Sequence, residues 1–317
     1  MASTTHRLPL NALHAKRGWN FGPGPALLPD SVLIQAQEAL WCFEDTGMGV
    51  AEISHRSPRF MELADRLESG LRALFAIPRT YDVLFLPGGA TPHFSLIPVN
   101  LALARKTPHA AYAITGHWSR LAHHDAQTLV DATVAMDTYA EPAAGPGGRT
   151  IPELSRWSVD PQAAFLYYTD NESIDGIEFP APPAVSMPPL VSDMTANLCS
   201  RPVPIERFDL IFAGAQKNLG VTGMGLVIVR KDRLEKEISG WPPILSYGCW
   251  AESHSMPNTP LRSTGILHIS WSSGWKRRAG SKHSPPAMTG RPHSFIRLST
   301  RVGGFTRTRF HPPAARG

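Results

Sequence analysis

Hydrophobic positions in residues 30–75 recur at helical spacing. Residues 30–40 (DSVLIQAQEAL) follow Pro29 and begin with an acidic residue, the pattern of a capped amphipathic helix. Residues 59–75 (RFMELADRLESGLRALF) place apolar side chains three and four positions apart. The pattern therefore predicts two amphipathic helices near the start of the chain.

Beyond residue 80 the pattern changes to short runs that are apolar at almost every position. The runs are residues 82–86, 110–114, 163–168, 190–191, 210–212 and 225–229. Strands that are apolar on both faces are typical of a buried, largely parallel sheet covered by helices. The predicted fold class is therefore α/β, and the Pro/Gly-rich residues 141–149 and 180–189 are predicted to be surface connections.

Charge divides the chain near residue 260. The sequence has 31 Lys and Arg and 26 Asp and Glu, but Glu252 is the last acidic residue. Eleven of the basic residues lie in 261–317, which leaves 20 basic and 26 acidic residues, a net charge of −6, in residues 1–260. We therefore expect an N-terminal extension and arm (1–29), a large domain (30–260) and a basic, atypical tail (261–317).

The tail has no core pattern, and we expect it to be disordered. Its abrupt composition suggests the hypothesis of a reading-frame shift, which resequencing through codon 260 would test. Basic residues interspersed with Trp271, Trp275 and Phe295 also allow nucleic-acid binding. We do not expect nucleic acid to be a partner. Truncation at Pro260 without loss of salt-sensitive DNA retention would exclude it.

Composition narrows the remaining classes. No run of about 18 apolar residues exists, so a membrane span is not expected. The three cysteines, Cys42, Cys199 and Cys249, lack metal-site spacing, which predicts no metal and a reducing, cytoplasmic location. Residues 1–29 lack acids, a pattern open to a transit peptide, but Pro9 interrupts any amphipathic helix there and favours a disordered extension.

The candidate chemistry lies at one lysine and one aspartate. Lys217 sits in the Gly/Ala-rich turn FAGAQKNLG (212–220) after an apolar run, and Asp193 ends another apolar run. Most lysines are solvated surface residues, so the pair alone is weak evidence. An enzyme that uses pyridoxal phosphate (PLP) needs such a pair, because the amine forms a Schiff base and the carboxylate keeps the pyridine nitrogen protonated.

Seven segments occur around this pair, one of which contains Lys217. They are NFGPGP (20–25), GMGVAEISHR (47–56), LPGGATPHF (86–94), GHW (116–118), NESIDG (171–176), AGAQKN (213–218) and SMPNTP (255–260). Together with Asp193, and in this order, they resemble the phosphoserine aminotransferases, class V aminotransferases of the type I PLP fold. The resemblance covers about residues 18–260 and implies a mostly parallel central sheet between helices, with the small C-terminal lobe truncated or replaced.

The resemblance implies a role for each matching residue. Lys217 is the Schiff-base lysine and general base, Asp193 the partner of the pyridine nitrogen, and Trp118 the aromatic that stacks on the cofactor. Ser173, where the family usually has threonine, offers a hydroxyl to the cofactor ring oxygen.

Further residues are implied to bind anionic groups. Around the cofactor phosphate they are the backbone and hydroxyl groups of residues 89–91, including Ala90 and Thr91, together with Gln216. Asn258 and Thr259 are implied to reach the phosphate site of a partner subunit in a homodimer. His55 and Arg56 are implied to bind the doubly anionic substrate.

The implied reaction moves an amino group between L-glutamate and 3-phosphohydroxypyruvate, giving O-phospho-L-serine and 2-oxoglutarate in serine biosynthesis. The family also acts in pyridoxine biosynthesis. Pro23 departs from a family serine, and no arginine of the tail matches the family's α-carboxylate ligand. Three alternatives stay open: a serine–glyoxylate aminotransferase, a cysteine desulfurase using Cys249, and a catalytically impaired PLP-binding remnant.

Overall fold

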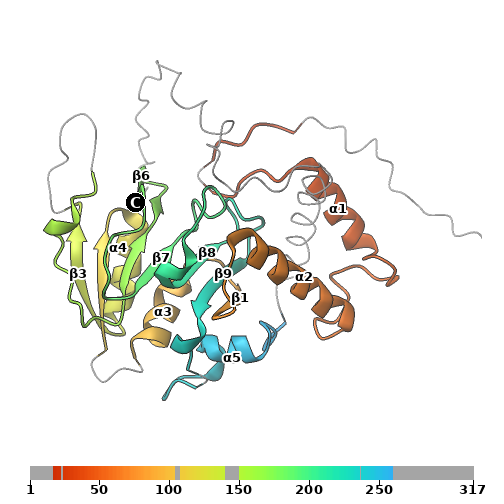
Figure 1. The fold of residues 1–317 in the computed structure, drawn as a ribbon. Helices are drawn as coiled ribbons and strands as arrows, with labels where there is room; N and C mark the ends of the chain where they lie inside the picture. The colour runs from red at the N-terminus through yellow and green to blue at the C-terminus, as the bar shows by residue number, and fades with distance from the viewer. Residues whose placement is uncertain (1–16, 23, 104–107, 140–149, 236, 260–317) are drawn as a thin grey trace, which may run out of the picture.

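The computed structural model describes residues 17–22, 24–103, 108–139, 150–235 and 237–259. Its central feature is a seven-stranded sheet with the order β1-β9-β8-β7-β4-β2-β3 (Figure 1). The strands of the sheet are β1 (Tyr81–Pro87), β2 (His109–Ile114), β3 (Asp131–Asp137), β4 (Leu166–Thr169), β7 (Leu190–Asp193), β8 (Phe208–Gly214) and β9 (Met224–Arg230). A separate antiparallel pair consists of β5 (Asn171–Glu172) and β6 (Ile177–Glu178).

The sheet is mostly parallel, as predicted. The pairs β2–β3, β2–β4, β4–β7 and β7–β8 are parallel. Of its seven strands, only β9 runs against the rest, because it pairs antiparallel with both β1 and β8. All six predicted runs fall in or overlap strands. Because β1, β2, β4, β7 and β8 run in the same direction, their carboxyl ends meet at one edge of the sheet.

Five α-helices occur in the described residues. They are α1 (Asp30–Trp41), α2 (Pro58–Phe75), α3 (His93–Leu101), α4 (His117–Gln127) and α5 (Tyr247–Glu252). Short 3₁₀ turns are η3 (Leu154–Arg156), η4 (Ile205–Arg207), η5 (Lys231–Arg233) and η6 (Pro243–Leu245). Both predicted helices are present, but the predicted cap of the first is wrong, since Pro29 occupies the N-cap and no side chain caps α1.

Helix α2 shows why its sequence starts and stops where it does. The Ser57 hydroxyl accepts the Phe60 N–H at 3.3 Å, and Pro58 occupies the first turn, where its missing N–H costs nothing. The helix ends at Ala76, which adopts a left-handed conformation with φ of 51°. The predicted helix at residues 59–75 is therefore confirmed within one residue at its start.

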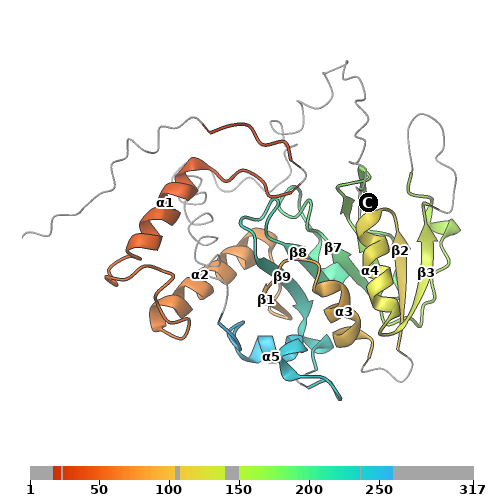
Figure 2. The ribbon, with the colours of Figure 1, turned by 180° about the vertical axis from the view of Figure 1, so that it is seen from behind.

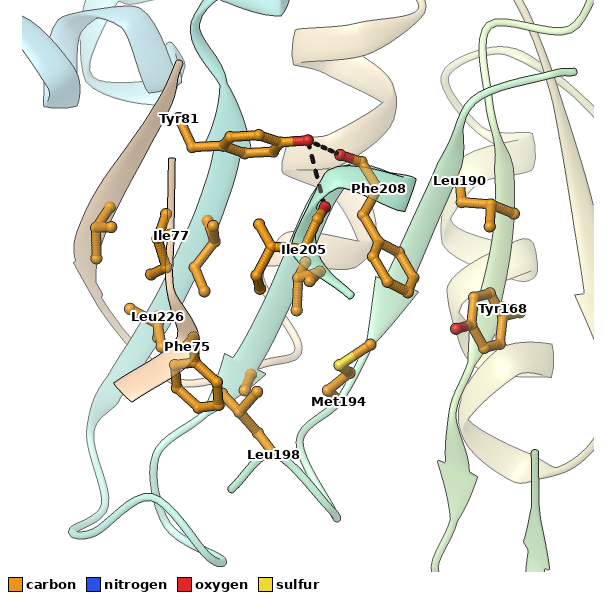
Figure 3. Packing of buried hydrophobic residues seen from close by; sticks show 14 of the residues in the cluster. Phe75, Ile77, Tyr81, Tyr168, Leu190, Met194, Leu198, Ile205, Phe208 and Leu226 are labelled. Atoms are coloured by element: carbon orange, nitrogen blue, oxygen red, sulfur yellow. Dashed lines mark hydrogen bonds between the residues drawn. The ribbon is translucent and has the colours of Figure 1, made fainter. Parts of the chain in front are cut away.

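Alternate residues of the strands of the main sheet, except the edge strand β3, fill two different cores. On β1, Val83 and Phe85 belong to the cluster that includes Leu67 and Leu71 of α2. Their neighbours Leu84 and Leu86 belong to the cluster formed with α3, α4 and α5. The first cluster is drawn in Figure 3, where the Tyr81 hydroxyl donates to the carbonyls of Ile205 and Phe208. Burial on both faces explains why the strands read as unbroken apolar runs.

The helix α1 lies outside these layers. It packs on α2 through a third cluster that includes Ala39, Phe43, Leu63 and Met256, so α2 separates it from the sheet (Figure 2). None of the described helices is long and apolar enough to cross a membrane. The predicted connection at residues 141–149, Pro23, and the tail with its nucleic-acid candidates lie outside the described residues. The division into 1–29, 30–260 and 261–317 stays a prediction.

Candidate active site

Lys217 lies in the turn that follows β8, at the carboxyl edge of the sheet. Its ammonium donates to the Ser173 hydroxyl at 2.6 Å, and Nζ lies 5.9 Å from the centre of the Trp118 ring. The indole N–H of Trp118 also donates to Ser173, at 3.4 Å. The structure therefore brings together three residues that lie 44 to 99 positions apart in the sequence and that were predicted to share one site.

The electrostatics of this corner favour a reactive amine. Partial burial lowers the pKa of Lys217, while the carboxylates of Asp193 and Glu172 act in the opposite direction. A lower pKa leaves a larger fraction of the amine unprotonated near neutral pH, and the unprotonated form is the nucleophile and the base.

Asp193 is the last residue of β7, paired in register with Phe212 of β8, and only 4% of it is exposed. Its Oδ1 accepts the backbone N–H of Thr195 at 2.8 Å. Burial raises the pKa of this carboxyl to about 6, against the lowering effect of Thr195. Within the described part of the chain, Asp193 forms no ion pair. A buried anion of this kind is stabilised when a cationic group, such as a protonated ring nitrogen, pairs with it.

Thr195 is a supporting residue that the sequence analysis did not single out. Its backbone N–H binds Asp193, and its hydroxyl accepts the N–H of Gly214 at 3.0 Å. Thr195 thus connects the ends of β7 and β8, the two strands that carry Asp193 and Lys217. A hydroxyl two positions after a strand-ending aspartate is a common turn pattern and was a usable signal.

Glu172 is the other residue that the sequence analysis missed. It is fully buried, and its two carboxylate oxygens accept the backbone N–H groups of Trp118 and Ser119 at 2.9 and 2.8 Å. Burial raises the pKa of Glu172, and the bonds from Ser119 and Trp118 lower it. The only sequence signal for Glu172 is its place beside Ser173 in the NESIDG segment. Its hydrogen-bond partners lie over 50 residues away in the sequence, so no local pattern indicates them.

The loop between β1 and α3 forms a cradle of backbone donors. Gly88 and Gly89 have φ angles of 108° and 93°, a region that glycine alone adopts without strain. Among the described residues, the N–H groups of Gly89, Ala90 and Thr91 form no hydrogen bond. They lie just before the first turn of α3, so the helix dipole adds to their attraction for an anion.

Gln216 joins this cradle. A Cβ at Gly214 would lie 2.4 Å from Gln216 Oε1 and 3.1 Å from the Ala90 backbone nitrogen. The amide of Gln216 and the N–H of Ala90 therefore meet across a space that only glycine leaves open. The Gln216 carbonyl in turn accepts the Ala26 N–H at 3.0 Å, so the N-terminal arm passes directly beside the lysine turn.

The structure does not bring the other predicted residues into this corner. His55 and Arg56 belong to the connection between α1 and α2, which Figures 1 and 2 show at the outer end of α2, away from the sheet. Asn258 and Thr259 are exposed and follow Ser255, whose hydroxyl accepts the Phe85 N–H at the outer edge of β1. Their predicted roles in binding substrate and a partner's phosphate site stay predictions.

The assembled corner fits a flat, phosphorylated pyridine aldehyde. The amine of Lys217 is in reach of an aldehyde, the unpaired carboxylate of Asp193 suits a protonated ring nitrogen, and the cradle at Ala90 suits a phosphate. Among the described residues, no group of three or more His, Cys, Asp or Glu is placed to hold a metal. A lysine turn facing a buried aspartate at the carboxyl edge of a mostly parallel sheet defines the type I PLP-dependent fold.

Comparisons with known proteins specify the family. A family model described as aminotransferase class-V matches residues 18–284, continuing past the expected limit at residue 260. The phosphoserine aminotransferase of Laribacter hongkongensis (strain HLHK9) is 46% identical over 242 residues, which are 76% of this chain and 65% of that protein. The chain belongs to the class V aminotransferase family, and it spans about 65% of the length of this relative.

Comparison with solved structures leads to the same family. Phosphoserine aminotransferase from Bacillus circulans subsp. alkalophilus superposes with a TM-score of 0.75 at 35% identity, covering 83% of this chain and 71% of that one. The PLP-bound phosphoserine aminotransferase from Trichomonas vaginalis superposes with a TM-score of 0.74 at 35% identity, covering 83% and 76%. The expected resemblance and the expected α/β, type I PLP fold are confirmed.

Proposed function

We propose that the chain is a PLP-dependent phosphoserine aminotransferase. It would move the amino group between L-glutamate and 3-phosphohydroxypyruvate, with O-phospho-L-serine and 2-oxoglutarate as the other pair. The observation that carries the proposal is the meeting of Lys217, Ser173 and Trp118 beside the buried Asp193. The names of the relatives above support the substrate class.

The residues divide the work of cofactor chemistry. When bound, PLP supplies an electron-withdrawing ring that stabilises negative charge at the substrate α-carbon. Asp193 would hold a proton on the ring nitrogen, and Trp118 would cover one face of the ring. Residues 89–91 and Gln216 would bind the phosphate. Lys217, with its lowered pKa, would remove the substrate α-proton and return it to the carbon that carries the cofactor's aldehyde group.

Substrate selection belongs to His55 and Arg56 in this proposal. The guanidinium of Arg56 is exposed and presents a fork that suits a phosphate or carboxylate. Because both residues lie apart from Lys217 in one copy of the chain, they would serve a site only in an assembly. A homodimer is therefore part of the proposal. The proposal also includes a cytoplasmic location, supported by the sparse cysteines, and a second role in pyridoxine biosynthesis, supported by the family resemblance.

An absorbance titration tests the proposed function. The purified chain with PLP should show a visible cofactor band that L-glutamate shifts to shorter wavelength, and O-phosphoserine should do the same. Lys217→Ala should retain a folded circular dichroism spectrum but lower the rate of the shift by about 10³-fold or more.

A visible band that ignores both amino acids would instead favour the catalytically impaired remnant. A response to serine with glyoxylate, but not to phosphoserine, would favour another class V aminotransferase. Absence of any band in a folded chain would contradict cofactor binding itself.

A further inference from the structure

The carboxylate of Glu172 has no part in the roles assigned above, although it lies at the centre of the site. It is fully buried on the short strand β5, yet both oxygens are used by α4, through the N–H groups of Trp118 and Ser119. Buried carboxylates are costly unless their hydrogen bonds return the lost hydration. Two charge-assisted bonds at a helix N-terminus meet that requirement.

Glu172 is linked to both neighbours of Lys217, to one by a hydrogen bond and to the other by the chain itself. Glu172 binds the backbone of Trp118 directly, and the next residue in its own chain segment is Ser173. Trp118 and Ser173 are hydrogen-bonded to each other, and Lys217 contacts both. A shift of this one carboxylate therefore moves the ring face and the hydroxyl that surround the amine.

Gly116 shows how closely the carboxylate is held. A Cβ at this position would lie 2.5 Å from the Glu172 Cδ and 2.6 Å from Asp175 Oδ2. Its φ of −164° is ordinary extended backbone, so the requirement for glycine comes from space alone. The absence of a side chain at Gly116, just after β2, therefore leaves the space through which the Glu172 carboxylate reaches the first turn of α4.

We propose that Glu172 is the positioning residue of the site, which holds Trp118 and Ser173 in register around Lys217. The inference rests on the proposed function. Glu172 also supplies a second negative charge beside Lys217, after Asp193, and so favours the protonated state of the nitrogen. Glu172 would act through Trp118 and Ser173 as a positioning residue.

Glu172→Gln separates positioning from simple stability. The glutamine keeps the size of the side chain and one acceptor oxygen, but it turns an NH₂ group toward a second N–H donor. In the PLP-loaded variant we expect an altered visible circular dichroism of the cofactor band and a lower midpoint in its pH titration. The kcat/KM for O-phosphoserine should fall about tenfold or more, because the ring and hydroxyl are displaced.

Asp175→Asn is the matched control. Asp175 accepts the His117 N–H at 2.7 Å on the same helix end, and its charge raises the pKa of Glu172, but it is not among the charges that act on Lys217. The asparagine removes that charge and so favours the ionised form of Glu172. The cofactor signals and kcat/KM of this variant should match those of the unmodified chain. Glu172→Asp, which keeps the charge, should restore the titration midpoint but not the full dichroism, and it replaces the glutamine variant if that variant does not fold.

The outcomes distinguish the two proposals. An unmodified chain without a cofactor band contradicts the proposed function. If that chain shows the band and Glu172→Gln has the same dichroism, midpoint and kcat/KM, the positioning role is wrong while the proposed function stands. Equal losses in Asp175→Asn would also overturn it, since removing either acceptor at the start of α4 would then have the same effect.

Discussion

At the scale of single residues, the buried charge of Asp193 destabilises the cofactor-free protein. The side chain is 4% exposed and carries a pKa raised to about 6 by burial. An aspartate in the unfolded chain titrates near its ordinary value of 3.8. The folded, cofactor-free protein therefore holds an ionised carboxylate at neutral pH at a cost of roughly 3 kcal/mol, which a cationic ring nitrogen would offset.

The sign of the pH dependence follows from this shift. Because the folded pKa is the higher one, the folded state binds the proton more tightly between pH 3.8 and about 6. The contribution of Asp193 to stability is full below that window and is lost as pH rises through it. Asp193→Asn should therefore stabilise the cofactor-free protein at pH 8, by roughly 3 kcal/mol at most, and by less at pH 5.

Urea unfolding of the cofactor-free proteins, followed by circular dichroism at pH 5 and pH 8, checks this prediction. The same substitution should lower kcat of the loaded protein by about 10²-fold or more, because the amide cannot hold the ring nitrogen protonated. A variant that is destabilised equally at both pH values would show that the Asp193 charge is not strained in the folded state.

At the scale of elements, the start of α4 depends on the space at Gly116. Gly116→Ala places a Cβ against the Glu172 and Asp175 carboxyl groups, so we expect a loss of about 2 kcal/mol in the free energy of unfolding. Gly70→Ala is the control, since Gly70 lies inside α2 and a Cβ added there would meet no atom within 4 Å. That substitution should stabilise the protein by about 0.5–1 kcal/mol.

Thermal or urea unfolding of both alanine variants tests whether Gly116 is required because a Cβ would clash there or because its backbone needs the freedom of glycine. Destabilisation of Gly70→Ala to the same extent as Gly116→Ala would contradict the steric explanation. Retention of full stability in Gly116→Ala would show that the two carboxylates can move away without cost.

The elements that the sequence predicted are those with strong internal patterns. The amphipathic α2 and the two-face apolar strands show their periodicity within their own residues. The strand β3 was not predicted because it is an edge strand with exposed residues, including Val134 at 42%. Helix α4 was not predicted because its polar, histidine-rich sequence has few apolar positions, and its cap comes from Glu172, far away in the chain.

At the scale of the whole molecule, the same limit applies to the site. Lys217, Asp193, Trp118 and Ser173 could be named in advance because a resemblance supplied their roles, and the structure brings them together. Glu172 could not, because the backbone N–H groups that it binds approach it only after the strands have paired. Thr195 carried a turn signal two positions after Asp193 that the sequence analysis did not use. The antiparallel direction of β9 was equally hidden, since a buried apolar strand has the same pattern in both directions.

The largest exposed side chains of the described residues point to the assembly that the proposed function requires. Trp19 and Phe21 on the N-terminal arm are 88% and 90% exposed, and Trp41 at the end of α1 is 74% exposed. Aromatic side chains left in water at this scale are typical of surfaces that another protein covers. The arm passes beside the lysine turn through the Ala26–Gln216 bond, so a partner that covers it lies near the site.

We therefore predict that the double substitution Trp19→Ser with Phe21→Ser weakens the homodimer. Loss of two buried aromatic anchors should cost about 3 kcal/mol, which raises the dimer dissociation constant about a hundredfold. Light scattering coupled to size-exclusion chromatography, over a dilution series, measures this change. Met187→Ser, at a residue that is 55% exposed on the connection between β6 and β7, is the matched control and should leave the dissociation constant unchanged. An unmodified chain that runs as a monomer at every concentration would contradict the homodimer, and the substrate role of His55 and Arg56 would fail with it, because one copy holds them apart from Lys217.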